Sequence, residues 1–137
     1  MMPESREAVW FRRTCRMVAC FPLVLGGTIA LSGTAGFEVM FGVEVGIVDS
    51  TFESGVRFLA TTFLGMGLVL WWASADFFGR SGAVQIFFVA MVFGALARLI
   101  GIRVHGTPNL MSLVLIGIEL TGAPMLLWHR RLLGQRK

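Results

Sequence analysis

The sequence predicts an all-α protein, a bundle of four transmembrane helices with both termini in the cytoplasm. Apolar residues make up 55% of the 137-residue chain and charged residues only 15%. Soluble domains are typically about 25% charged, and so short a chain has too little interior to hide this many apolar side chains from water. Four apolar stretches hold most of them. The composition therefore excludes an ordinary soluble domain, a disordered chain and a disulfide-rich secreted scaffold.

Each apolar stretch has roughly the 20 residues that a helix needs to cross the hydrocarbon core. Ser50 and Glu53 form a capping-box pattern, which predicts that the second helix begins near Thr51. Strict alternation of apolar and polar residues, the pattern of a transmembrane barrel strand, is missing. The expected spans are 17–37, 51–75, 83–102 and 110–128, within a membrane domain of 17–128 between basic cytoplasmic segments 1–16 and 129–137.

Two features interrupt this regular pattern. The segment 36–52, between the first two spans, alternates partly between apolar and polar residues, which predicts a short hairpin or a stretch lying on the membrane surface. Pro22 and Pro124 lie inside the first and fourth spans. Each removes a backbone hydrogen bond, so we expect both helices to be kinked.

The distribution of charge predicts the orientation. The segment between the first two spans is mainly acidic, and the positive-inside rule places the basic terminal segments in the cytoplasm. All four tryptophans fall at span ends on that same face, where indole rings prefer the headgroup region. These basic residues flank apolar runs and form no basic-aromatic groove, so no nucleic-acid partner is expected. They are Arg6, Arg12, Arg13 and Arg16, and Arg130, Arg131, Arg136 and Lys137.

Ionisable residues at membrane depth are the candidate functional residues, because a charge at the bilayer centre costs at least about 2.5–3.5 kcal/mol. Glu119 lies near the middle of the fourth span and Arg98 near the end of the third. A short loop makes these two helices antiparallel neighbours, so the two side chains can pair. The pair is either a structural ion pair that fixes helix register or a site for a proton or polar ligand. In a third alternative, Arg98 extends to the interface and Glu119 faces a partner subunit.

A second pair, Glu53 and Arg57, lies four residues apart at the outer start of the second helix. One interpretation is an interfacial ion pair. The other is that these two residues join Arg98 and Glu119 in lining an outward-facing polar vestibule.

Patterns of catalytic and metal-binding residues are missing from the sequence. His105 and His129 are expected on opposite faces of the membrane, so they cannot share a metal ion within one subunit. No Ser-His-Asp or Cys-His arrangement can be assembled, and the glycines lie in apolar runs, where small residues let helices approach closely. We therefore expect no catalytic residues, no metal and no cofactor.

The charged residues belong to a set of short motifs. These are Glu-Ser-Gly-Val-Arg-Phe at 53–58, Gly-Ala-Leu-Ala-Arg-Leu-Ile at 94–100, Gly-Thr-Pro at 106–108, and Glu-Leu at 119–120 followed by Pro124. In this order, over roughly residues 18–130, the chain resembles the DUF4345 family of small four-helix bacterial integral membrane proteins. The resemblance implies the fold and a multi-pass protein of the bacterial cytoplasmic membrane, and it highlights Arg57, Arg98 and Glu119. It supplies no reaction, because the family has no assigned activity.

The sequence favours a non-catalytic membrane protein that acts through helix–helix contacts, as an accessory or assembly and stabilising subunit of a larger complex. Its expected partners are the lipid bilayer and other membrane subunits or further copies of the chain. The alternative is a small transporter or a protein that binds a lipid or another hydrophobic ligand, with Glu119 as the proton or substrate site and Arg98 as its counter-ion. A weaker alternative is a membrane enzyme acting on a lipid or quinone through Glu53, Arg57, Arg98 and Glu119.

Overall fold

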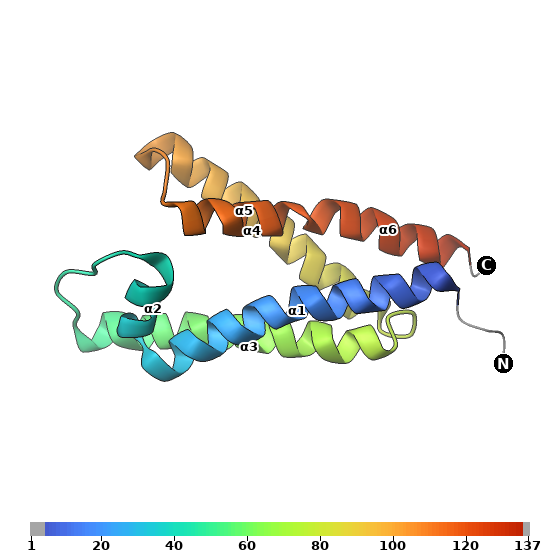
Figure 1. Ribbon diagram of the computed structural model, residues 1–137, viewed down its shortest axis with the longest axis horizontal. Helices are drawn as coiled ribbons and strands as arrows, with labels where there is room; N and C mark the ends of the chain where they lie inside the picture. The colour runs from blue at the N-terminus through green and yellow to red at the C-terminus, as the bar shows by residue number, and fades with distance from the viewer. Residues whose placement is uncertain (1–4, 136–137) are drawn as a thin grey trace.

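The computed structural model describes residues 5–135, which form helices arranged as two pairs along one long axis (Figure 1). Four helical stretches are long and apolar enough to cross a membrane, with α5 and α6 together forming the fourth. The predicted all-α class is therefore confirmed, and the helices include the four apolar candidate spans that were predicted. The helices are α1 (Arg6–Ser32), α2 (Thr34–Phe41), α3 (Ser50–Ala75), α4 (Ser81–His105), α5 (Leu110–Leu120) and α6 (Gly122–Gly134).

Helices α1 and α3 form the first pair and lie side by side along their length (Figure 1). They meet backbone to backbone at Gly26, where an added Cβ atom would lie 2.6 Å from the Leu64 nitrogen and 2.7 Å from the Ala60 oxygen. Only glycine permits so close an approach. Pro22 lies inside α1, which continues through it as one helix. The kink predicted at Pro22 therefore does not end the helix.

The first helix ends earlier than the apolar stretch suggests, because the chain turns at Gly33 and starts a new helix, α2. Gly33 has φ 64°, in the left-handed region that favours glycine. The hairpin predicted for 36–52 is wrong, since Thr34–Phe41 is helical and no strand occurs within residues 5–135. Helical spacing is what stacks Phe37 on Phe41, with ring centroids 4.6 Å apart.

Helix α3 begins at Ser50, one residue from the predicted start, but the predicted capping box is wrong. The Asp49 side chain caps the helix by accepting a hydrogen bond from the Phe52 nitrogen at 2.7 Å. The Glu53 carboxylate, which a capping box would require at the helix start, instead binds the first residue of α2.

The kink predicted at Pro124 is confirmed as a break between α5 and α6 at Thr121. A proline nitrogen at 124 cannot donate to the carbonyl of Leu120, four residues earlier, and Leu120 is the last residue of α5. The Thr121 hydroxyl donates to the Ile118 carbonyl at 2.6 Å, which satisfies one of the acceptors left at the break.

The end of the bundle near the termini is tightly packed. Its core includes Phe11, Phe77 and Phe88, all nearly inaccessible to solvent. His129 is fully buried among them, with its ring stacked 5.3 Å from that of Phe11 and its Nε2 3.1 Å from the Phe77 carbonyl oxygen. Helix α6 continues past His129 to Gly134, so the first residues of the expected C-terminal tail belong to the packed bundle.

At the other end the two pairs diverge (Figure 1). The buried core there is small, consisting of Leu25, Ile29, Ala60 and Leu115. Helix α2 crosses part of the gap, and the Asn109 side-chain amide, just before α5, donates a hydrogen bond to the Phe41 carbonyl at the end of α2. The bundle is therefore closed at one end and partly open at the other.

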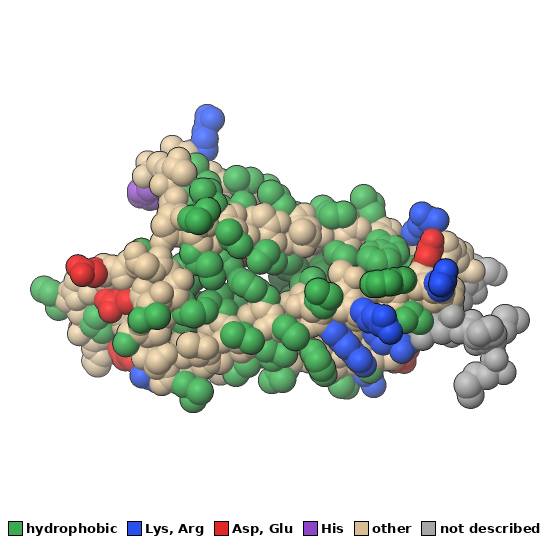
Figure 2. Space-filling model, in the orientation of Figure 1, with side chains coloured by type: hydrophobic (Ala, Val, Ile, Leu, Met, Phe, Trp, Pro, Cys, Tyr) green, Lys and Arg blue, Asp and Glu red, His purple; other side chains and the backbone are tan. Residues whose placement is uncertain are grey.

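Basic and acidic side chains are concentrated at opposite ends of the bundle. Figure 2 shows apolar side chains over the helices, arginines gathered toward the closed end and most of the visible acidic side chains at the open end. At the closed end three arginines lie over tryptophan rings, with the Arg80 guanidinium 4.0 Å from the Trp72 centroid and those of Arg13 and Arg16 each 5.7 Å from Trp10 and Trp71. Such pairs suit the water–lipid interface, because both side chains have apolar and polar parts.

We expect Gly33→Ala to destabilise the protein more than Gly42→Ala. Both glycines have φ above 60°, where an L-residue costs about 1–2 kcal/mol. Only at Gly33 would the new Cβ atom also meet a neighbour, 1.9 Å from Glu53 Oε1, whereas at Gly42 the space is open. Thermal unfolding in detergent, followed by circular dichroism, measures the difference. Equal losses for the two variants would contradict this account of the α1–α2 junction.

Candidate functional site

The candidate site is centred on Arg98 of α4 and Glu119 of α5, which form an ion pair. Arg98 Nε donates to both oxygens of the Glu119 carboxylate, at 3.1 Å to Oε1 and 3.2 Å to Oε2. The Glu119 side chain is 15% exposed and that of Arg98 39%. The structure thus brings together the two residues predicted to pair across the antiparallel helices.

Gly94 makes room for the Glu119 carboxyl group. It lies one turn before Arg98 on α4, and a Cβ atom added to it would be 3.4 Å from the carboxyl carbon and from Oε2. A larger side chain at 94 would press on the carboxylate from the same side as Arg98. Sequence analysis grouped Gly94 with Arg98 in one motif but gave it no role. The sequence signal for this role was the position of Gly94 four residues before Arg98, on the same face of the helix.

Three cavities meet at Arg98. The largest, about 470 Å³, lies between the two helix pairs and is mostly apolar, with Gly94, Arg98 and Glu119 on its wall and Phe63 and Met66 of α3 opposite. A second, about 240 Å³, lies toward α2 and is lined by apolar side chains besides Arg98.

The third cavity, about 310 Å³, lies beneath the α4–α5 loop at the open end, and its wall is more polar. Arg98, His105, Thr107 and Ser112 line it. The arginine side chain is therefore on the boundary between an apolar interior and a polar opening. His105, the last residue of α4, was considered in the sequence only as a possible metal ligand. Its position on the same cavity wall as Arg98 depends on the tertiary fold.

Arg98 retains unused hydrogen-bonding capacity. Within residues 5–135, hydrogen-bond partners are found for its Nε alone, which leaves both terminal nitrogens open to the surrounding cavities. A guanidinium group presents five N–H donors in a fixed plane and binds a carboxylate or phosphate through two parallel hydrogen bonds. Arg98 can therefore bind a further anionic or hydrogen-bond-accepting group.

Glu53 and Arg57 also form an ion pair, but at a different place. Arg57 Nε lies 2.7 Å from Glu53 Oε1, and neither residue lines any of the three cavities that contain Arg98. The structure therefore does not bring the four charged residues together into the vestibule that was considered from the sequence.

The second pair binds both helix ends at the α1–α2 junction. The Glu53 carboxylate accepts hydrogen bonds from the backbone nitrogen and the hydroxyl of Thr34, at the start of α2, at 2.9 and 2.5 Å. Arg57 Nη1 donates to the carbonyls of Ala30 and Leu31, in the last turn of α1, both at 2.9 Å. A negative charge at the start of a helix and a positive charge at its end both interact favourably with the helix dipole, so the pair stabilises the end of α1 and the start of α2.

The described residues hold no group of three or more His, Cys, Asp or Glu side chains arranged to bind a metal ion. His129 and His105 lie at opposite ends of the bundle, as sequence analysis expected, with His129 in the packed core. Cys15 is buried, Cys20 is exposed, and both are free thiols.

We expect Arg98→Met to destabilise the protein more than the double variant Arg98→Met/Glu119→Leu. The single change leaves the carboxylate without its partner beside an apolar cavity, whereas the double change removes both charges. A double-mutant cycle should give a coupling energy of about 0.5–2 kcal/mol, the range for polar contacts inside membranes. Unfolding in detergent measures the four proteins. Additive effects would show that the two side chains do not interact.

The family comparison agrees with these observations. The chain matches the model described as Domain of unknown function (DUF4345) over residues 11–129, which includes most of each of the four candidate spans and the residues of both ion pairs. Neither the search of curated proteins nor that of solved structures found a match. The model covers well over half of the chain, so this protein, a multi-pass membrane protein by the length and composition of its helices, belongs to the DUF4345 family.

Proposed function

We propose that this protein binds a lipid or lipid-like molecule between its two helix pairs, beside Arg98 and Glu119. The observation that carries the proposal is the convergence of three cavities on one partly unpaired arginine. Binding sites for small molecules typically have volumes of about 300–1,000 Å³, apolar walls and a few polar groups that fix orientation. The 470 Å³ cavity and its ion pair have these properties.

The position of the cavity suits a ligand that arrives through the membrane. Helices α1 and α3 contribute Val18, Phe21 and Phe63 to its wall, and α4 contributes Ala90 and Ala97. These side chains present no hydrogen-bonding groups, so they favour an alkyl chain over a polar solute. The polar pair then provides a fixed point for the ligand's head. Glu53 and Arg57 lie outside this proposed site, since their hydrogen-bonding groups are engaged at the α1–α2 junction.

A second candidate function is that of an accessory subunit that binds a helix of a larger complex in the same opening. Small residues occur at regular helical intervals on the cavity-facing side of α4, namely Ala90, Gly94, Ala97 and Gly101. Such spacing allows a neighbouring helix to approach closely. This candidate retains the function first expected from the sequence and places its contact surface on α4.

Filling the cavity tests both candidates. We expect Ala97→Phe to weaken saturable binding of a tritiated, mid-chain diazirine derivative of hexadecanol by about tenfold, equivalent to about 1.4 kcal/mol, because the new ring occupies the ligand's volume. Ala123→Phe is the matched control, as it adds the same ring to the outer surface between α4 and α6. Photolysis and peptide mapping should place the label on residues that line the cavity.

Purification of the same variants in mild detergent separates the two candidates. Lipid binding predicts a protein that retains the probe without a stoichiometric partner. A partner subunit that is recovered with the wild-type protein and with Ala123→Phe, but lost with Ala97→Phe, would favour the accessory function. Non-saturable labelling of lipid-facing residues alone would contradict the ligand-binding proposal.

We also propose that both termini lie in the bacterial cytoplasm, so that the α2–α3 loop faces the outside. The support is the gathering of arginines and arginine–tryptophan pairs at the end where the termini lie (Figure 2). Alkaline phosphatase inserted at Gly46 should be active, and the same enzyme fused after Lys137 should be inactive in cells. The reverse pattern of activity would overturn this orientation.

A further inference from the structure

We propose that the molecule bound at this site is an amphiphile with an anionic head group, and that Glu119 takes up one proton when it binds. In the ligand-free protein Arg98 is paired with the Glu119 carboxylate. In the bound protein the anion takes this place on Arg98, and a proton from solvent neutralises Glu119. This inference rests on the proposed function, to which it adds the chemical class of the ligand and a coupling to pH.

The polar cavity beneath the α4–α5 loop provides the place for the head group. Arg98 lies at the boundary between this cavity and the apolar ones, and His105, Thr107 and Ser112 supply further polar groups around it. An alkyl chain attached to a head group at Arg98 would extend into the 470 Å³ cavity, which Arg98 also lines. The polar cavity therefore suits the head group of an amphiphile, and the adjoining apolar cavity suits its alkyl chain.

The geometry of the existing ion pair leaves it open to exchange. Among residues 5–135 Glu119 is bound through Arg98 Nε alone, and both carboxylate oxygens share that single nitrogen. An incoming carboxylate or phosphate can instead use two nitrogens of the guanidinium fork, which is the stronger arrangement. The gain in hydrogen bonding offsets the separation of Arg98 from Glu119.

Charge balance requires the proton. On the walls of the three cavities the ionisable side chains are Arg98, Glu119 and His105. Around Glu119 itself, α1 and α3 contribute only apolar side chains, α5 contributes Leu115 and Ile118, and α4 contributes Arg98. An added anion would leave a net negative charge inside a low-dielectric cavity, which is costly. Protonation of Glu119 keeps the site neutral, with one cation and one anion before and after binding.

Fatty acids and lysophospholipids both have the chemistry that this site requires. Each carries one negative charge shared between two oxygens, attached to an alkyl chain. Two tritiated probes represent these sources, palmitate and palmitoyl-lysophosphatidylglycerol. Monopalmitoylglycerol has the same chain with an uncharged head and serves as the neutral control. Each is measured by scintillation proximity with the purified full-length protein in a non-ionic detergent.

The pH dependence of lysophosphatidylglycerol binding is the decisive measurement, because the phosphodiester of this probe stays ionised from pH 5 to 8. We expect its dissociation constant to rise by up to about tenfold for each unit by which the pH is raised, because one proton is taken up with each molecule bound. Glu119→Gln should bind the probe tightly at every pH. His105 is the other ionisable side chain on these cavity walls besides Arg98 and Glu119, so His105→Gln is tested as well. This variant should retain the pH slope whatever its affinity for the probe.

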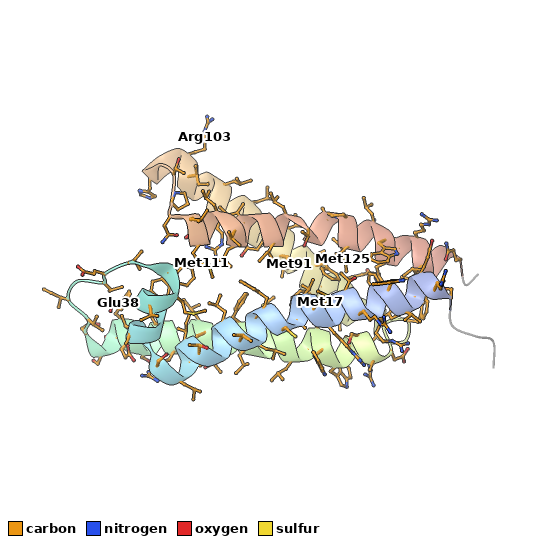
Figure 3. All side chains as sticks on the ribbon, viewed as in Figure 1. Met17, Glu38, Met91, Arg103, Met111 and Met125 are labelled. Carbon is orange, nitrogen blue, oxygen red and sulfur yellow. The ribbon has the colours of Figure 1, made fainter. Side chains whose placement is uncertain are left out.

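Arginine variants test the anion site. Arg98→Gln should lose binding of both anionic probes. Arg103→Gln on the same helix should retain it, because Arg103 points away from the bundle in Figure 3. In the wild-type protein, titration in weakly buffered solution should record about one proton taken up for each molecule bound. This measurement needs no variant and applies even if Arg98→Gln fails to fold.

The outcomes separate this inference from the proposed function. Binding of palmitate alone or of the lysophospholipid alone would identify the head group as a carboxylate or a phosphate, provided that the proton is taken up. Equal, pH-independent binding of all three probes would overturn the anionic ligand and leave the lipid-binding function intact. Saturable binding of none of the three probes would contradict the proposed function itself.

Discussion

The ion pair between Arg98 and Glu119 fixes the register of the two helices beside the main cavity. A lone carboxylate beside an apolar cavity would be expensive, as would a lone guanidinium group, and pairing lowers both costs. Because the two side chains come from adjacent antiparallel helices, their contact fixes how far α5 is displaced along α4. Gly94 then becomes part of the same constraint, since the carboxylate occupies space that a side chain there would fill. The walls of the main cavity follow from this register.

Packing is distributed unevenly along the bundle, and this places the cavities. Aromatic side chains fill the end near the termini, where His129 is enclosed between Phe11 and Phe77. At the opposite end small side chains line α4, and the break at Thr121 permits a change of direction between α5 and α6. The packed end thus holds the four helices together, while the two helix pairs remain apart at the other end. A bundle packed equally well throughout would have no volume for a ligand.

The sequence alone predicted what depends on composition and local spacing. Four spans follow from apolar length, the α5–α6 break from Pro124, and the central ion pair from two charges on neighbouring antiparallel helices. Prediction from the sequence failed where a side chain contacts a residue that is distant in the chain. Glu53 was interpreted through its neighbour Ser50, but its carboxylate binds Thr34 across the α1–α2 junction. The cavities were beyond prediction for the same reason, because they are spaces between helices whose separation no local pattern encodes.

The two ion pairs, compared within one molecule, indicate why Arg98 is more than a structural link. Arg57 uses Nε and Nη1 to bind Glu53, Ala30 and Leu31, so its contacts hold a helix junction together. Within the part of the chain that the structure describes, Arg98 forms hydrogen bonds with Glu119 alone, through one nitrogen, while cavities adjoin its side chain. If register were the only requirement, a well-packed apolar contact would serve as well or better, because it avoids the cost of desolvating two charges. A guanidinium group beside these cavities, with two nitrogens that form no hydrogen bond to residues 5–135, is suited to bind a group that enters the cavity.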